Sequence, residues 1–281
     1  MRRYEPIAGI TVGASGTDST IPIPANRRLL LARLYAAGVA AGPVNVFGAD
    51  VLSDIQVFVG TNLLWIITAQ ELLDQANFSG ENLVPSASVG IPLYFADPHR
   101  ASVMDEQVTA WDLFGSAPLT IKARTKDALT GVTLSVVLVY DDQFTTNSAG
   151  ARILNIVKNE PVNLGSLGTV ADILSPVVPV DLPIQRIFIY PEAGNSILAV
   201  RVTINNSQII HDMTAEQNAE TLKDYGLVST PGNGNPYPVV FDTNGQLFDG
   251  LAPQQSIKLH IQQSAAGQVK LVLQRRTGQY S

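Results

Sequence analysis

The sequence predicts an all-β protein of two tandem eight-stranded jelly rolls, each with one short capped helix. Two observations lead to this prediction. The stretch 55–95 recurs about 146 residues further along the 281-residue chain, which indicates an internal duplication. Each copy also offers about seven or eight short strands, joined by turns and long connections, with little other helix. Such strand counts favour a two-sheet sandwich, and long cross-connections that hold a helix favour a jelly roll.

The first copy opens on a pair of strands. Apolar residues 55–59 and 63–67 are expected to be strands, because the Gly-Thr-Asn between them is typical of a tight turn. Thr68 and Glu71 follow, three residues apart, and form the capping box that starts a short helix. After a polar loop, residues 91–95 are expected to form another strand.

The second copy repeats this order. Strands are expected at 198–204 and 209–210, and Thr214 with Gln217 forms a second capping box. The helix that follows is expected to end at Gly226, because a residue without Cβ readily takes the left-handed conformation that closes a helix. This shared order of turn, cap and helix is the main reason to expect two domains of one fold.

The alignment of the two copies then changes its offset. Phe95 recurs as Phe241 at the offset of 146, whereas Ile121-Lys122 recurs as Ile257-Lys258 at an offset of 136. The second copy is therefore expected to lack about ten residues before its last hairpin. Duplicated domains commonly diverge in this way, by changes confined to loops.

The rest of the chain supplies the remaining strands and a boundary. Strands are expected at 4–12, 29–35, 119–126, 132–140, 152–157 and 185–190, with a closing hairpin at 256–275. Residues 13–20 are expected to be flexible, and the segment before 182 to be loosely ordered. The Asp-, Asn-, Ser- and Gly-containing segment 141–150 is typical of a boundary. The predicted domains are residues 1–147 and residues 148–281.

Composition excludes several classes of function. Charged residues make up only 15% of the chain, against roughly 25% in an average globular protein. Low charge is typical of surface that becomes buried in interfaces. The net charge of −6 provides no basic field, so direct nucleic-acid binding is not expected. The absence of cysteine excludes disulfides, thiolate metal sites and a cysteine nucleophile.

Neither a membrane-spanning helix nor a leader peptide is expected. The longest apolar segment, 29–47, is interrupted by Arg33 and by Gly and Pro residues, and is too broken to cross a bilayer. Residues 1–15 have a basic start and a short apolar core, as in a signal peptide, but Glu5 and Pro6 interrupt them. We therefore expect a mature N-terminus.

No catalytic, cofactor-binding or metal-ligating residue is predicted. The three histidines, His99, His211 and His260, lie far apart in the sequence, whereas a cupin-like jelly roll holds its metal with clustered His and Glu. Ser15 lies in a Gly-rich stretch that lacks the spacing of a nucleophile elbow, so that stretch is interpreted as a linker.

Carboxylates and aromatic residues give weaker hypotheses. Asp141-Asp142, and the loop group of Asp97, Asp105 and Glu106, are expected to be solvated, although a structural calcium ion between subunits is possible at either. A carbohydrate-binding face needs several exposed aromatic rings. Only two tryptophans are present, and one of them, Trp65, lies in an apolar strand and is expected to be buried.

The organisation of the chain resembles one family. The resemblance lies in 55–77 with its Thr68 box, in 200–226, and in the terminal hairpin 256–275. These features are similar to those of the double jelly-roll major capsid proteins of tailless, membrane-containing double-stranded DNA bacteriophages, most closely the corticovirus type. The likeness follows nearly the whole chain in order and spacing, and no signature motif carries it.

This resemblance implies a structural function without catalysis. It implies a homotrimer whose six rolls form a pseudo-hexagonal capsomer of an icosahedral shell, in contact with neighbouring capsomers and with minor and vertex capsid proteins. The N-terminal side would face an internal viral membrane, where Met1–Tyr4 are suited to anionic headgroups. The protein would be located in the virion after assembly in the host cytoplasm.

Two other classes of function stay open from the sequence. The first is a virion spike or a secreted β-sandwich that binds carbohydrate or a receptor, with Trp111 as the residue to test. The second is an enzyme of the cupin or isomerase type, which requires a bound transition metal.

Overall fold

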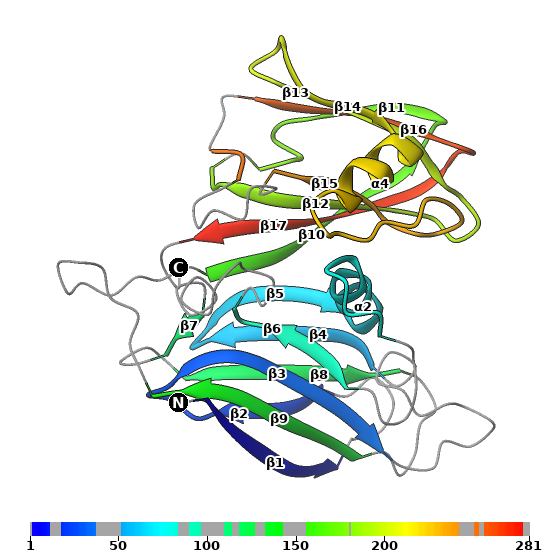
Figure 1. The fold of residues 1–281 in the computed structure, drawn as a ribbon. Coiled ribbons are helices and arrows are strands. Elements are labelled where there is room, and N and C mark those ends of the chain that lie inside the picture. Colours follow the sequence, from blue (N-terminus) through cyan, green and yellow to red (C-terminus); the bar gives the residue numbers. More distant parts are fainter. Residues whose placement is uncertain are drawn as a thin grey trace, which may run out of the picture. The chain divides into compact units, whose positions relative to one another are not determined.

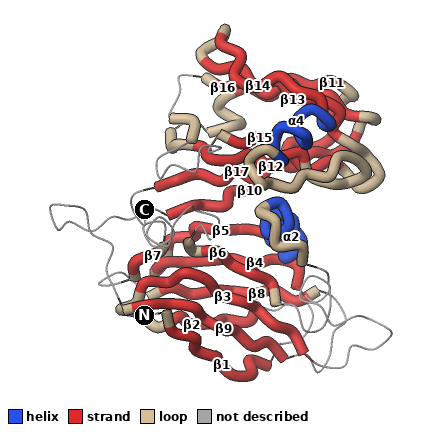
Figure 2. The backbone as a smooth tube through the Cα atoms, viewed as in Figure 1, coloured by secondary structure: helices blue, strands red, loops and turns tan. Residues whose placement is uncertain are grey.

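A computed structural model describes residues 2–11, 18–37, 52–83, 90–96, 110–113, 118–126, 133–142, 156–179, 181–241, 250–252 and 256–277. Strands dominate these residues, and helices α2 and α4 accompany them (Figures 1 and 2). The chain divides into two compact units. The first comprises Met1–Asn77, Glu81–Val157 and Thr277–Ser281, and the second comprises Phe78–Gly80 and Lys158–Arg276. The domain boundary predicted at 147 lies outside the described residues, so it stays a prediction.

The elements of the first half follow the sequence in order. They are β1 (Arg3–Thr11), β2 (Asp18–Ile23), β3 (Arg28–Ala37), β4 (Leu52–Val59), β5 (Asn62–Thr68), α2 (Ala69–Phe78), β6 (Ile91–Tyr94), β7 (Trp111–Asp112), β8 (Leu119–Thr125) and β9 (Thr133–Asp141).

The elements of the second half repeat this order, with an isolated bridge between Ile184 and Leu251 in the place of the two-residue strand β7. They are β10 (Ile156–Leu167), β11 (Val170–Leu174), β12 (Ile184–Pro191), β13 (Ile197–Ile204), β14 (Gln208–Thr214), α4 (Ala215–Lys223), β15 (Tyr237–Val240), β16 (Ile257–Gln263) and β17 (Gly267–Thr277).

Strand order in the first unit is that of a jelly roll. One sheet has the order β1-β9-β3-β6, with β7 paired to β3, and the other has the order β5-β4-β8-β2. The first strand therefore lies beside the last, and the chain crosses repeatedly between the two sheets. The neighbouring strands β1 and β9, β3 and β9, and β4 and β8 are antiparallel.

The second unit has the same strand order. Its sheets are β15-β12-β17-β10 and β11-β16-β13-β14, which places each strand where its counterpart lies in the first unit. Helices α2 and α4 both follow the fifth of the eight long strands of their unit. The predicted fold class, two jelly rolls each with a capped helix, is confirmed.

Side-chain alternation builds the cores. Strands β8 and β16 have the same pattern over seven residues, in which every second side chain is buried, as expected for strands with one face on a core. In the second unit, the fully buried side chains of Ile187, Val202, Leu259 and Leu271 belong to one cluster that joins both sheets. Each unit is thus a sandwich with its own apolar centre.

An aromatic group occupies the core of the first unit. Trp65 stacks on Phe95 with 5.1 Å between ring centroids, and Trp111 meets both rings edge-on, at 5.5 Å from Trp65 and 4.9 Å from Phe95. The indole N–H of Trp65 donates to the carbonyl oxygen of Val157 at 2.6 Å. Burial of Trp65 is therefore as predicted, whereas Trp111 lies in strand β7, within a segment expected to be a loop.

The predicted offset for the last hairpin is wrong by two residues. Leu119 pairs with Val59 and Ile257 pairs with Ile204, and in each pair the partner is the last residue of its strand. Leu119 thus corresponds to Ile257, which is an offset of 138 rather than 136. Since side chains alternate with a period of two along a strand, residues of β8 and β16 that are 136 apart still lie on the same face.

Three other boundaries differ from the prediction. Residues 170–174 form strand β11 where a loose segment was expected, and β2 begins at Asp18 within the stretch expected to be flexible. Strand β10 extends to Leu167, ten residues beyond the predicted end at 157. The sequence of β11, Val-Ala-Asp-Ile-Leu, does not alternate between apolar and polar residues although only residues 171 and 173 face inward, so the usual signal of a half-buried strand is missing.

Both capping boxes form as predicted. In α2, Glu71 N–H donates to Thr68 Oγ1 at 3.2 Å and Thr68 N–H donates to a Glu71 carboxylate oxygen at 2.9 Å. In α4, Gln217 N–H donates to Thr214 Oγ1 at 3.3 Å and Thr214 N–H donates to Gln217 Oε1 at 3.0 Å. Each box satisfies backbone N–H groups that the first turn of a helix cannot pair by itself.

The two helices also end alike. Gly80 and Gly226, which are 146 residues apart, have positive φ angles of 90° and 73°. The following residue in each case donates its N–H back across the helix end, from Glu81 to Ala76 O at 3.1 Å and from Leu227 to Leu222 O at 3.0 Å. Both ends are therefore glycine-based C-caps, and the predicted role of Gly226 is confirmed.

We expect Thr68→Ala and Thr214→Ala each to lower the free energy of unfolding by about 1 kcal/mol, because each removes a side-chain acceptor for a helix N–H. Urea denaturation measures this change. Thr214→Ser keeps the hydroxyl acceptor and serves as the control, with a stability close to that of the parent. Equal stability of all three variants would contradict the assigned caps.

Candidate assembly surface

Of the three histidines, the structure describes His211 and His260, and these two have separate hydrogen-bond partners. His99, Ser15, Asp97, Asp105 and Glu106 lie outside the described residues. His211 lies on β14 and His260 lies on β16. Within the described ranges, no group of three or more His, Cys, Asp or Glu is placed to hold a metal ion. Neither described helix has the length and apolar character needed to cross a bilayer.

The adjacent carboxylates Asp141 and Asp142 both pair with arginine. Asp141 is buried and accepts two hydrogen bonds from Arg28, at 2.9 Å from Nε and 2.6 Å from Nη2. Asp142 is half exposed and lies 2.6 Å from the guanidinium of Arg3. Cation binding at this pair would have to compete with two arginines, and calcium between subunits stays a prediction that no contact here tests.

A buried arginine also stabilises the corresponding end of the second unit. Arg275 near the end of β17 has a side chain only 4% exposed and donates to Glu160 on β10 at 2.6 Å. It also donates to Asp181, which precedes β12. Each roll thus contains a buried guanidinium where its third strand begins and its last strand ends, with carboxylates that compensate its charge.

His211 is a titratable group of the second unit whose pKa is shifted by burial. Its Nε2 lies 2.9 Å from the hydroxyl of Tyr237, and that hydroxyl donates to the carbonyl oxygen of Met213 at 3.1 Å. Burial lowers the pKa of His211 from its usual 6.5 to about 4, although nearby Asp212 acts in the opposite direction. The imidazole is therefore neutral at pH 7 and donates a hydrogen bond to Tyr237.

We expect this histidine to reduce stability in acid. The unfolded chain takes up a proton near pH 6.5 and the folded chain only near pH 4, so stability falls as the pH drops between these values. The full loss below pH 4 is about 3 kcal/mol, from a pKa difference of roughly 2.5. His211→Gln keeps a donor but does not titrate, so its urea stability is expected to fall less between pH 7 and pH 4. Parallel pH profiles would contradict this assignment.

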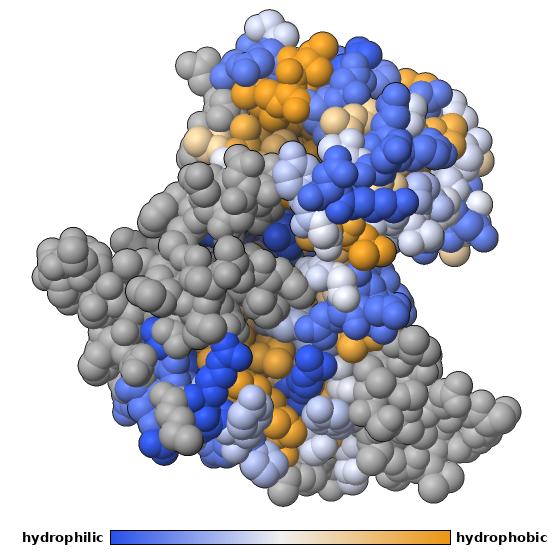
Figure 3. Space-filling model, in the orientation of Figure 1, coloured by the Kyte–Doolittle hydropathy of each residue, from blue (hydrophilic) through white to orange (hydrophobic). Residues whose placement is uncertain are grey.

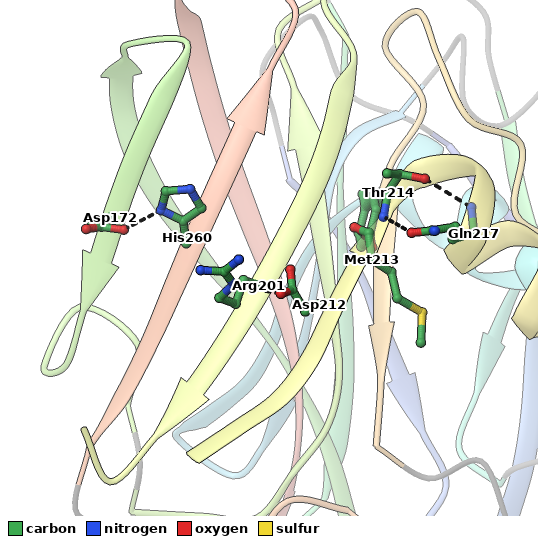
Figure 4. Close-up of polar contacts among 8 residues, drawn as sticks. Asp172, Arg201, Asp212, Met213, Thr214, Gln217 and His260 are labelled. Carbon is green, nitrogen blue, oxygen red and sulfur yellow. Dashed lines mark hydrogen bonds and ion pairs between the residues drawn. The ribbon is translucent and has the colours of Figure 1, made fainter. Parts of the chain in front are cut away.

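The outward side of the sheet β11-β16-β13-β14 carries a charged row. We call this side of the sheet the unit-2 outer face. Asp172, His260, Arg201 and Asp212 lie directly opposite one another on the four strands in turn. His260 Nδ1 is 2.7 Å from Asp172, and Arg201 Nε donates to Asp212 at 2.9 Å (Figure 4). The row crosses the whole sheet.

Ion pairs within this row, and one with Lys258 in the next row, balance its charges. Lys258 Nζ lies 2.8 Å from the second oxygen of Asp172. Hydrogen bonding from Lys258, and then from His260, holds the pKa of Asp172 below its usual value. All of these side chains are at least 40% exposed, and ion pairs in such surroundings contribute little to folding stability. The row is therefore a surface feature and not a support of the fold.

Apolar side chains flank the charged row. Val170 and Leu174 on β11 and Ile209 on β14 are each 54% exposed, and Leu198 on β13 is 41% exposed. Figure 3 shows apolar surface over β13 and β14 among hydrophilic residues. The charged row thus lies in the middle of the face, and the row on each side of it has exposed aliphatic residues at the strand ends. Such apolar patches on a protein surface commonly mark interaction sites.

The first unit has a related outer face on β2, β8, β4 and β5. Asp18 pairs with Arg124 at 2.9 Å, and Lys122 lies 4.7 Å above the ring of Phe58. Leu63, the second residue of β5, is 40% exposed. Ile209 is the second residue of β14 and lies 146 residues after Leu63, the same offset as that between the helix caps. Both rolls therefore expose an aliphatic residue at the same structural position.

A known protein family matches part of this chain. Residues 154–275 match the family model of the viral coat protein P2 C-terminal domain. The match falls on the second unit and includes the strands of the unit-2 outer face. No curated protein matches the chain.

Solved structures extend the likeness to the whole chain. The major capsid protein P2 of bacteriophage PM2 is 19% identical, with 98% of this chain and 97% of that one aligned at a TM-score of 0.77. The STIV MCP is 15% identical, with 100% and 98% covered and a TM-score of 0.67. The Faustovirus major capsid protein is 8% identical, with 99% and 90% covered and a TM-score of 0.62. The resemblance to double jelly-roll capsid proteins is confirmed.

Proposed function

We propose that this protein is the major capsid protein of an icosahedral virus with an internal membrane. One observation carries the proposal: both jelly rolls, in order and over nearly the full length of each chain, align with a bacteriophage major capsid protein. The match of residues 154–275 to the family model of a viral coat protein domain supports it independently from the sequence. The protein resides in the virion, and its subunits assemble in the host cytoplasm.

In this proposal three chains form a homotrimer, the capsomer. Two rolls of one strand order in each chain give six similar units, and threefold symmetry then produces a nearly hexagonal outline. Capsomers contact one another, and minor and vertex proteins complete the shell. The proposal assigns no catalytic role, and nucleic acid is not a direct partner of a chain with net charge −6.

The inner face of the shell is proposed to be the end where each roll begins and finishes. In the first unit Arg3 and Tyr4 open strand β1, and the side chain of Tyr4 is 69% exposed. An exposed aromatic ring next to basic residues suits the headgroup region of an anionic membrane. Arg3 would approach lipid while it stays paired with Asp142.

A carbohydrate-binding or spike function is not favoured. Trp111, the residue that such a function would use, is 1% exposed and packs edge-on against Trp65 and Phe95. A stacking platform for a sugar ring needs an open aromatic face. Trp65, at 2% exposure, offers none either.

Light scattering on the purified protein tests the proposal. A homotrimer gives a mass of about 90 kDa, three times the chain mass of 30.0 kDa, and negative-stain images of it have a hexagonal outline. A monomer at micromolar concentration would contradict the proposal. Flotation with vesicles of phosphatidylserine, compared with vesicles of phosphatidylcholine alone, tests the membrane-facing side separately.

A further inference from the structure

We infer that the unit-2 outer face is covered by a second copy of this chain, with Ile209 at the contact. The inference rests on the proposed homotrimer and specifies which surface forms it. The occupant is another subunit of the same protein, bound across β11, β16, β13 and β14. Three observations support this contact: an exposed residue recurs in both rolls, the charges on the face are balanced, and one chain contains only two rolls.

An exposed aliphatic residue recurs at the same position in both rolls. Ile209 and Leu63 are each the second residue of the strand that follows a tight turn, and they are 54% and 40% exposed. Neither contributes to a core, so folding of the rolls does not explain them. A contact that recurs from roll to roll does explain them, because every roll in a ring then presents the same point to its neighbour.

The charges on the unit-2 outer face are paired with one another. Asp172 is paired with Lys258 and His260, and Asp212 with Arg201. A partner that covers the face therefore does not leave an uncompensated charge, which is the main cost of burying ionised groups. Aliphatic residues on either side of the row supply the apolar area that interfaces bury at their centres. The face has the composition of an interface before any partner is present.

The number of rolls in one chain identifies the occupant of this face. A contact repeated around a ring needs a roll on each side, and one chain contains only two rolls. The ring is completed only by further copies of the chain, so the surface at Ile209 is filled by one of them. A partner of another kind would have no reason to match a position that the duplication kept in both rolls.

Site-specific labelling tests this inference, since the chain has no cysteine of its own. Ile209→Cys and Val170→Cys each place one thiol on the unit-2 outer face. Val228→Cys is the matched control, because Val228 is 52% exposed, close to the 54% of Ile209 and Val170, but lies beyond helix α4 and off the sheet. Maleimide labelling is followed on the full-length protein, with its mass measured in the same solution.

In the assembled protein, Ile209→Cys and Val170→Cys are expected to label at least roughly tenfold more slowly than Val228→Cys, because covered thiols react only when the interface opens. Dilution until the protein is monomeric should abolish the difference. Equal labelling of all three variants in a protein of trimer mass overturns the inference and leaves the proposed function standing. A parent protein that is monomeric at every concentration overturns both.

A charge substitution gives a second, independent readout. Ile209→Asp is expected to shift the protein from trimer to monomer at micromolar concentration, whereas Val228→Asp keeps the trimer. Circular dichroism and urea denaturation confirm that both variants are folded, which both exposed positions permit. A folded Ile209→Asp variant that stays as trimeric as Val228→Asp overturns the inference.

Discussion

Arg28→Met is expected to lower the free energy of unfolding by about 3 to 5 kcal/mol, because it leaves buried carboxylates without their cation. Arg28 on β3 lies opposite Asp141 on β9 and Asp112 on β7, and both aspartates are only 1% exposed. The bidentate hydrogen bonds to Asp141 at 2.9 and 2.6 Å have no equivalent in methionine. Urea denaturation at pH 7 measures the loss.

Arg124→Met is the matched control for this prediction. Arg124 also pairs with an aspartate in the first unit, Asp18, but the two side chains are 44% and 34% exposed. Removing an exposed pair changes stability by at most about 1 kcal/mol. The double variant Arg28→Met with Asp141→Leu should recover part of the loss, because it removes the unpaired carboxylate as well. Similar losses from Arg28→Met and Arg124→Met would contradict the buried pair.

Phe95→Ala is expected to cost about 3 to 5 kcal/mol, because it opens a cavity in a fully packed core. The ring is 1% exposed and contacts both tryptophans of the first unit. The duplication supplies the control: Phe241, at the equivalent position, is only partly buried against the core of the second unit. Phe241→Ala is therefore expected to cost less, and an equal or larger cost would show that the aromatic group is not the reason.

Thermal unfolding with near-ultraviolet circular dichroism adds a direct readout for this pair of variants. Trp65 and Trp111 give the signal of the aromatic group, and only Phe95→Ala removes a ring that contacts them. We expect the near-ultraviolet spectrum to change in Phe95→Ala and to stay like that of the parent in Phe241→Ala. A spectrum changed equally in both variants would contradict the assignment.

Local signals were enough to predict much of the fold. Thr68 and Thr214 define helix starts through residues three positions away, and short apolar runs around a tight turn define the strands before them. Such short-range patterns survive in a single sequence, and the repetition in a second copy strengthened them. Gly80 was a usable signal that was missed, since it stands 146 residues before Gly226 and closes its helix in the same way.

Long-range pairing was not predictable from the same patterns. Arg28 and Asp141 are 113 residues apart, and nothing in their neighbourhoods indicates that they meet. Asp141 was interpreted as part of a solvated boundary, although it is the buried last residue of β9. The charged row on the unit-2 outer face was missed for a similar reason: it exists only when four strands align in one register.

The antiparallel order of the second roll has a practical consequence for imaging. The turn at 205–207 joins β13 to β14 at one end of the sheet, while the turn at 264–266 joins β16 to β17 at the other, since Ile204 pairs with Ile257. Short epitopes inserted in these two turns would carry antibody or gold to opposite ends of the roll. Electron micrographs of tagged particles then reveal which end of the roll faces the outside of the particle.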